Sequence, residues 1–236
     1  MKLQALYNEL MDLYAADPDV LGCYVSGSAS YGGMTPESDV DFYILTSEYH
    51  GFLERIHGVR RVEVRWRTLD EISLDIAAGG PYVYQLMDAT PVRDPEGKVA
   101  ELITDARERF NSFRHTASTV KDIHYRVGEA RMKLRSAIRK ADQPLQAYLC
   151  AVYTELLMEA LFVMVDKPLA RGTTAWRWFH RLPGLNAEGK DQLKELFQKP
   201  LTERAVKMES TLDQLHGSLT AKMKQQKSVT VNPLRK

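Results

Sequence analysis

The chain has 236 residues, of which 44% are hydrophobic and 27% are charged. This length suits one large domain or two modest ones, and the apolar share is sufficient for a buried core. The formal net charge of +1 argues against broad electrostatic binding of nucleic acid, and no apolar run approaches the ~20 residues of a membrane span.

The first part of the chain alternates strand and helix signals. Apolar residues at helical spacing predict a helix over residues 2–15, and residues 61–66 alternate polar and apolar as a strand with one exposed face does. Thr68 and Glu71 have the spacing of a capping box, which predicts a helix start. The other elements expected here are strands at 20–25, 39–46 and 90–93, helices at 48–56, 68–77 and 82–87, and a turn at 94–97.

Beyond residue 97 the strand signals end and long helical periods replace them. Thr173 or Thr174 is the expected N-cap of a short helix at 175–181. Further helices are expected at 99–110, 116–140, 145–165, 187–197 and 202–223. The sequence therefore predicts an α+β protein. A mixed-sheet domain over 1–97 is followed by an all-α helical bundle over 98–225 and a basic flexible tail over 226–236.

One stretch carries a recognisable chemistry. Gly27 and Ser28 end an apolar strand, and Ser38, Asp39 and Asp41 begin the next one. Carboxylates at positions i and i+2 of a strand point to the same face. A glycine–serine turn can offer backbone N–H groups and a hydroxyl to an anion, and carboxylates suit magnesium. The stretch predicts a nucleotidyl-transfer site in which the two aspartates bind Mg²⁺, while the glycine and the serines hold the triphosphate. Ser38 is also expected to cap the following turn or to orient Asp39.

A third carboxylate usually completes such a site from a neighbouring strand. Glu63 qualifies because Val62 and Val64 flank it and would point to the opposite face. The alternative is that Glu63 forms an exposed ladder of charges with Arg61 and Arg65.

This pattern of glycine–serine and Asp-x-Asp resembles the signature of the DNA polymerase β-type nucleotidyltransferase superfamily. More narrowly, it resembles the antibiotic-modifying branch typified by kanamycin nucleotidyltransferase. In that branch a Val-Glu-Val strand, a helix and an Asp-x-x-Gly turn follow, as residues 62–64, the helix from Leu69 and residues 91–97 do here. The resemblance covers about residues 20–140. It implies that Glu63 is the third metal ligand, that two Mg²⁺ ions bind, and that the protein is a homodimer.

The resemblance also implies a general base in the helical part. Glu129 would take the proton from the acceptor hydroxyl and Lys133 would contact phosphate, since positions i and i+4 share a helix face. An ordinary surface pair is the alternative. Asp122, Glu155 and Glu159 are rival candidates for the base, although carboxylates in so apolar a helix as 148–165 could equally form core salt bridges.

We therefore expect a Mg²⁺-dependent enzyme that transfers a nucleoside monophosphate, AMP from ATP, to a hydroxyl of a small-molecule acceptor. An aminoglycoside-like antibiotic and a housekeeping metabolite are both candidate acceptors, and the acceptor cleft is expected between the two domains. The alternatives are transfer to a protein or RNA end, and an antitoxin or sensor module that binds nucleotide without turnover.

The cysteines and the N-terminus bear on location. Cys23 and Cys150 lie in apolar segments, so we expect two buried, reduced thiols. Met1 leads directly into an amphipathic pattern with no signal peptide. These features predict a soluble, cytoplasmic protein.

Overall fold

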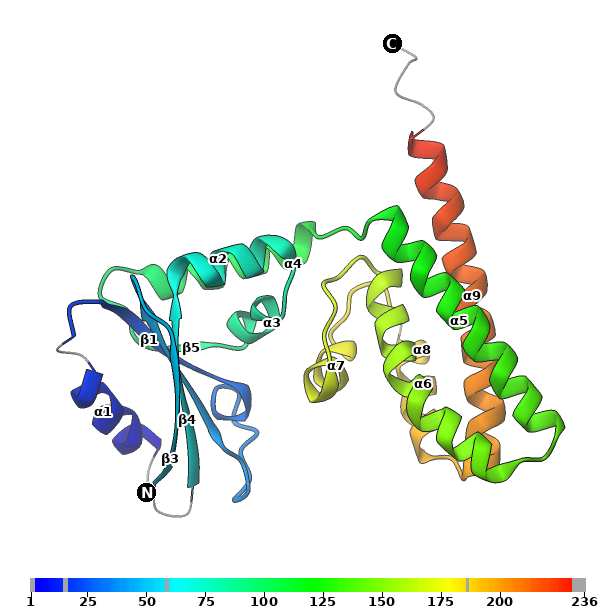
Figure 1. Cartoon of the computed structure of the whole chain (residues 1–236), viewed down its shortest axis with the longest axis horizontal. Coiled ribbons are helices and arrows are strands. Elements are labelled where there is room, and N and C mark those ends of the chain that lie inside the picture. Colours follow the sequence, from blue (N-terminus) through cyan, green and yellow to red (C-terminus); the bar gives the residue numbers. More distant parts are fainter. Residues whose placement is uncertain (1–2, 15–16, 58–59, 186, 231–236) are drawn as a thin grey trace, which may run out of the picture. The chain divides into compact units, whose positions relative to one another are not determined.

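The computed structural model describes residues 3–14, 17–57, 60–185 and 187–230. The chain divides into two compact units, Met1–Ser112 and Phe113–Lys236. The sequence placed this boundary at 97/98 instead. The difference is helix α4 (Lys98–Ser112), which packs against α2 (Leu69–Ala78), α3 (Tyr82–Met87) and strand β1 (Val20–Ser26) and so belongs with the first unit (Figure 1).

The first unit contains a five-stranded mixed sheet in the order β3-β4-β2-β1-β5. β2 and β4 are parallel, and the other neighbouring pairs are antiparallel. The strands are β1 (Val20–Ser26), β2 (Val40–Thr46), β3 (Gly51–His57), β4 (Arg60–Thr68) and β5 (Thr90–Arg93). The predicted mixed sheet, followed by helices, is confirmed.

The two faces of the sheet are covered differently. On one face, apolar residues of β1, β2 and β4 such as Phe42 and Val64 form a core with Leu6 and Leu10 of helix α1 (Leu3–Tyr14). Helix α4 lies on the other face. Its Val99 packs closely against Gly22 of β1, where an added Cβ would lie 2.8 Å from Val99 Cγ2. Burying each such aliphatic side chain contributes about 1.5–3 kcal/mol.

Residues 48–56 do not form the predicted helix. Residues 51–57 are the edge strand β3, which pairs in antiparallel register with β4 from Gly51–Trp66 to His57–Arg60. Phe52 packs under the guanidinium of Arg65, whose Cζ lies 5.1 Å from the ring centroid. Cross-strand pairing of this kind outweighs the intrinsic helix propensity that Glu and Leu give this segment.

Helix α2 confirms the predicted capping box. The Thr68 hydroxyl accepts a hydrogen bond from the backbone N–H of Glu71 at 3.2 Å, and the Glu71 carboxylate accepts one from the Thr68 N–H at 3.2 Å. Gly79 then ends the helix in the left-handed conformation, with φ of 74°. These contacts satisfy backbone groups that would otherwise lack partners at the two helix ends.

The second unit is helical, and its described elements are α5 (Ala117–Arg139), α6 (Gln143–Met164), α7 (Gly172–Phe179), α8 (Ala187–Gln198) and α9 (Leu201–Thr230). The start of α7 differs from the prediction, because Arg171 is its N-cap and makes no side-chain capping bond. The predicted tail also differs, since α9 continues to Thr230. Residues 231–236 lie outside the described residues.

Helix α6 corrects the expectation that no segment reaches the length of a membrane span. It has 22 residues, and its most apolar window reaches a mean hydropathy of 1.5, so it passes that test by length and composition. Within the unit it packs against both α5 and α9, and 56% of the window is buried. This packing accounts for its apolar composition. Cys150 of α6 and Cys23 of β1 are buried free thiols, as predicted.

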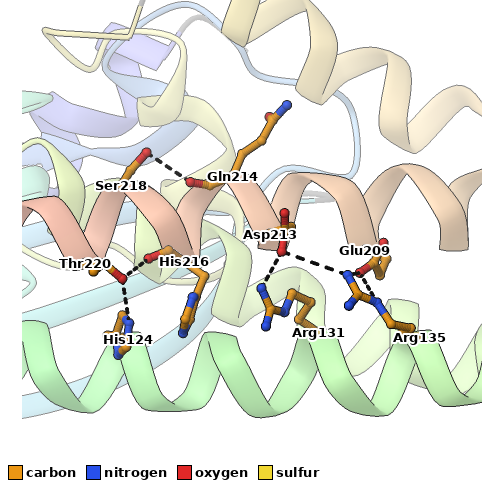
Figure 2. Close-up of polar contacts among 9 residues, drawn as sticks. All are labelled: His124, Arg131, Arg135, Glu209, Asp213, Gln214, His216, Ser218 and Thr220. Carbon is orange, nitrogen blue, oxygen red and sulfur yellow. Dashed lines mark hydrogen bonds and ion pairs between the residues drawn. The ribbon is translucent and has the colours of Figure 1, made fainter.

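Polar contacts join α5 to α9 along one seam (Figure 2). Arg131 forms an ion pair with Asp213, and Arg135 Nε donates to Glu209 Oε1 at 2.8 Å. Both arginines belong to α5 and both carboxylates to α9, so the ion pairs favour one register of the two helices. Their exposure to solvent limits each pair to about 1 kcal/mol or less.

Two histidines continue this seam. The rings of His124 and His216 stack with centroids 4.0 Å apart, and His124 Nε2 lies 2.9 Å from the Thr220 hydroxyl. Gly128 makes room for them, since a Cβ there would meet His216 Nε2 at 3.0 Å. Burial and the nearby His124 lower the pKa of His216. Protonating this ring therefore opposes the packing of α5 against α9.

Candidate active site

The candidate site begins as a row of polar residues across the sheet. Asp41 of β2 is in register with Ser26 of β1 on one side and with Glu63 of β4 on the other, and Glu63 is in register with Glu54 of β3. Residues directly opposite in neighbouring strands share a face and have Cβ atoms about 4.5–5.5 Å apart. The sheet thus brings together the carboxylates of Asp41 and Glu63, as the alternation of β4 predicted. Asp39 immediately precedes β2.

The turn after β1 lies against Asp41. Gly27 begins a short 3₁₀ turn, Gly27–Ala29, with φ of +65°. A Cβ added at Gly27 would meet Asp41 Oδ2 at 2.8 Å. Glycine is therefore needed here twice, for its backbone conformation and for the close approach of the carboxylate. Ser28, the predicted phosphate contact, is the second residue of this turn.

Ser38 holds the loop that leads into β2. Its hydroxyl accepts a hydrogen bond from the Thr35 N–H at 2.9 Å, and its own N–H donates to the Thr35 carbonyl at 3.1 Å. Arg60 Nη1 donates to the carbonyls of Thr35 and Ser38 at 3.3 and 3.5 Å. Ser38 thus stabilises the turn that precedes it, residues 35–38, whereas the sequence suggested that it caps the following turn or orients Asp39. Its predicted contact with nucleotide stays a prediction.

Glu63 is not the solvated charge of an exposed ladder, because only 7% of its surface is accessible. Both its oxygens are bonded to arginines of the same strand. Arg61 Nη2 lies 2.7 Å from Oε1, and Arg65 Nη2 contacts Oε2. Arg61 also reaches Glu54 Oε2 at 2.7 Å. From the sequence, the two arginines are expected only as surface residues beside Glu63. Their spacing of i±2 from Glu63 was the signal that could have placed them at the site.

The site concentrates negative charge. Burial first, and then the neighbouring charges of Asp39 and Glu63, raise the pKa of Asp41 to about 6, against a smaller opposing effect of Arg65 and Arg61. A carboxylate in such surroundings is stabilised by a cation that approaches it.

The donor set of Asp39 and Asp41 fits a magnesium ion, because Mg²⁺ is commonly bound through one or two carboxylates together with substrate phosphates. Among the described residues, no group of three or more His, Cys, Asp or Glu side chains is arranged to hold a metal ion. The oxygens of Glu63 face Arg61 and Arg65. Asp39 and Asp41 are thus of the residue type that Mg²⁺ needs, and the oxygens of the third predicted ligand are engaged by arginines.

Two tyrosines support the strands beside the carboxylates. Tyr24 and Tyr43 stack with ring centroids 5.0 Å apart and planes inclined by 9°. The Tyr24 hydroxyl accepts a hydrogen bond from Gln85 Nε2 at 3.0 Å, and the Ser26 hydroxyl donates to the Gln85 carbonyl at 2.8 Å. Burial raises the pKa of Tyr43, so its hydroxyl stays neutral and adds no charge to the site. Helix α3 thereby fixes the strand that carries Ser26 next to Asp41.

The predicted base lies in a pocket of about 250 Å³ within the second unit, between α5 and α6. The pocket brings together Glu129 and Lys133 with two of the rivals, Glu155 and Glu159. Glu159 is buried and forms an ion pair with Arg126 Nη2 at 3.0 Å, which is the structural role weighed for it.

Glu129 is embedded in a polar setting inside this pocket. A hydrogen bond to its carboxylate raises the pKa of the Tyr125 hydroxyl. Burial and the charge of Glu129 raise the pKa of Tyr153, which lines the same pocket. Asp122, the remaining rival, pairs with Arg126 at 3.6 Å and is not among the lining residues.

Comparison with known proteins finds similar solved structures, among them the following two. A nucleotidyltransferase-like protein from Exiguobacterium sibiricum 255-15 shares 13% identity with a TM-score of 0.45, over 92% of this chain and 75% of the other. Spectinomycin adenyltransferase AAD(9) from Enterococcus faecialis, solved with ATP and spectinomycin, shares 13% identity with a TM-score of 0.31, over 92% and 98%. No protein-family model and no curated protein matches. Neither likeness identifies a substrate or a catalytic residue of this chain.

Proposed function

We propose that this protein is a Mg²⁺-dependent nucleotidyltransferase that moves AMP from ATP to a hydroxyl of a small-molecule acceptor. The observation that carries the proposal is the carboxylate pair Asp39 and Asp41, with Asp41 packed against the left-handed turn at Gly27. Such a reaction needs charge on the phosphates to be neutralised and the attacking and leaving oxygens to be held in line.

Each side chain then has a role. Asp39 and Asp41 would hold the metal, which when bound neutralises phosphate charge and favours the attacking and leaving oxygens. Gly27 permits close approach of the triphosphate, and the Ser28 hydroxyl donates to a phosphate oxygen. Glu129 accepts the proton of the acceptor hydroxyl, and Lys133 contacts phosphate. Glu129 acts from the same chain or from the partner in a homodimer. We place the enzyme in the cytoplasm.

The Glu129 pocket also limits the acceptor. Its volume of about 250 Å³ is below the ~300–1,000 Å³ of a site that encloses a drug-sized ligand. It therefore receives one part of an acceptor rather than the whole. An aminoglycoside-like antibiotic and a metabolite both offer a hydroxyl on a part of that size.

Release of pyrophosphate from ATP tests the proposal. Purified protein is incubated with ATP, Mg²⁺ and a panel of acceptors, and mass spectrometry detects the nucleotide adduct. We expect Asp41→Asn to reduce turnover at least 1,000-fold with the fold retained, because a neutral amide is a poor magnesium ligand. Turnover at the wild-type rate in Asp41→Asn protein would rule out the assignment. A wild-type protein that binds ATP and releases no pyrophosphate with any acceptor would instead be a nucleotide-binding module.

A further inference from the structure

The two arginines that pair with Glu63, Arg61 and Arg65, differ in their other contacts. Arg65 has its guanidinium over the Phe52 ring, with Cζ 5.1 Å from the centroid, and its side chain is 35% exposed. Arg61 is more exposed, at 50%, and has a second carboxylate partner, Glu54, at the same 2.7 Å as Glu63. Arg61 can therefore leave Glu63 without losing its ion pair.

Glu54 is placed to keep Arg61 in this way. It is in register with Glu63 on the adjoining strand β3, so both carboxylates face the same side of the sheet and Arg61 bridges them. Removing Arg61 altogether would leave Glu63 with Arg65 alone in a largely buried position, and an incompletely paired buried carboxylate is costly. A cation that replaced Arg61 at Glu63 would remove that cost.

We propose that Arg61 and Glu54 form a displaceable clamp on Glu63. Without metal, Arg61 bridges Glu54 and Glu63 and neutralises the buried carboxylate. When a divalent cation occupies the site, Arg61 stays with Glu54 alone and Glu63 Oε1 becomes a ligand, while Arg65 remains on Oε2. Arg61 and Glu54 are thus positioning residues that set metal affinity. The inference rests on the proposed function, since it takes the aspartates as a metal site.

The clamp is tested by measuring the affinity of the whole protein for Mn²⁺ by calorimetry, in the absence of nucleotide. Arg61→Gln removes the competitor, so we expect about three- to tenfold tighter binding. Glu54→Gln removes the second partner of Arg61, which then holds Glu63 more firmly, so binding should weaken by a similar factor. The two variants move the affinity in opposite directions.

Two controls separate the clamp from a general effect of charge. Arg55 is exposed and in register with Val62, hence on the opposite face of the sheet, and Arg55→Gln should leave Mn²⁺ affinity within twofold of wild type. In the double variant, Glu54→Gln should have no further effect once Arg61 is Gln, because Glu54 acts through Arg61. An effect of Glu54→Gln that adds in full to that of Arg61→Gln would overturn the clamp.

Urea unfolding gives a readout that needs no activity. Arg61→Gln should lower the midpoint in EDTA, and the difference from wild type should narrow at saturating Mn²⁺, because the ion then takes the place of the guanidinium. If wild-type protein binds Mn²⁺ and releases pyrophosphate but Arg61→Gln leaves Mn²⁺ affinity unchanged, the clamp is wrong and the proposed function stands. If wild-type protein neither binds Mn²⁺ nor releases pyrophosphate, both are wrong.

Discussion

Replacement of Gly27 by alanine tests how closely the turn after β1 is fitted to Asp41. The new Cβ faces two obstacles, a backbone φ of +65° and the Asp41 Oδ2 atom 2.8 Å away. The left-handed conformation costs a non-glycine residue about 1–2 kcal/mol. With a urea dependence of roughly 1–3 kcal/mol/M, this alone lowers the unfolding midpoint by about 0.3–2 M.

The contact with Asp41 adds an effect on activity. The carboxylate is the end of a side chain, so it moves away from the new methyl group at small cost in stability. A shift of about 1 Å in a group that positions the reacting atoms can reduce turnover about 100-fold. We therefore expect Gly27→Ala to lose about 1–2 kcal/mol of stability and about 100-fold in pyrophosphate release.

Gly32 in the same loop is the matched control. Its φ is +76°, and nothing lies within 4 Å of a Cβ built there. Gly32→Ala therefore carries the backbone cost without the contact, and should lower the urea midpoint by a similar amount while turnover falls much less. If the two variants lose activity equally, Gly27 acts only through backbone conformation, and its fit to Asp41 has no bearing on catalysis.

Three further predictions concern other parts of the chain. Thr68→Ala should cost about 1 kcal/mol in urea unfolding, because the Glu71 N–H loses its cap; an unchanged midpoint would refute this. His216 has a lowered pKa in the folded protein, so the unfolded chain binds more protons and stability should fall as pH drops below about 6.5. His216→Gln should flatten that dependence between pH 7.5 and 5.5, and an equal slope in both proteins would contradict it. Glu129→Gln should reduce turnover about 100- to 10,000-fold with the urea midpoint retained, and full turnover would remove it as the base.

The parts of the fold that could be predicted are those where the local sequence pattern agrees with the packing that the element has in the fold. β1 and β2 are apolar on both faces, as expected for strands at the centre of a sheet, and the capping box at Thr68 fixes a helix start by local bonds alone. Edge strand β3 could not be read in this way. Its side chains are mostly exposed and carry no clear alternation, so only its pairing with β4 makes it a strand.

In the site, too, some features follow from the local sequence and others depend on contacts with a distant segment. The alternation of residues along β4 placed Glu63 on the face of Asp41, because a period of two follows from strand geometry. It could not show how Glu63 is neutralised. That depends on Glu54, which comes from the segment predicted as helix and reaches Arg61 only once β3 pairs with β4.

The ion pair between Glu54 and Arg61 links the error at strand β3 to the error at the site. A helix at 48–56 would not present Glu54 in register with Glu63, so the error in secondary structure also hid the second partner of Arg61. With β3 in place, successive ion pairs link the side chains of Glu54, Arg61, Glu63 and Arg65. Asp41 lies beside them and is the carboxylate with a raised pKa. A cation entering the site would therefore meet Asp41 and Asp39 first and Glu63 second. Metal affinity should accordingly respond more strongly to Asp41→Asn than to Glu63→Gln in the same Mn²⁺ titration, and the reverse order would place the primary ligand on β4.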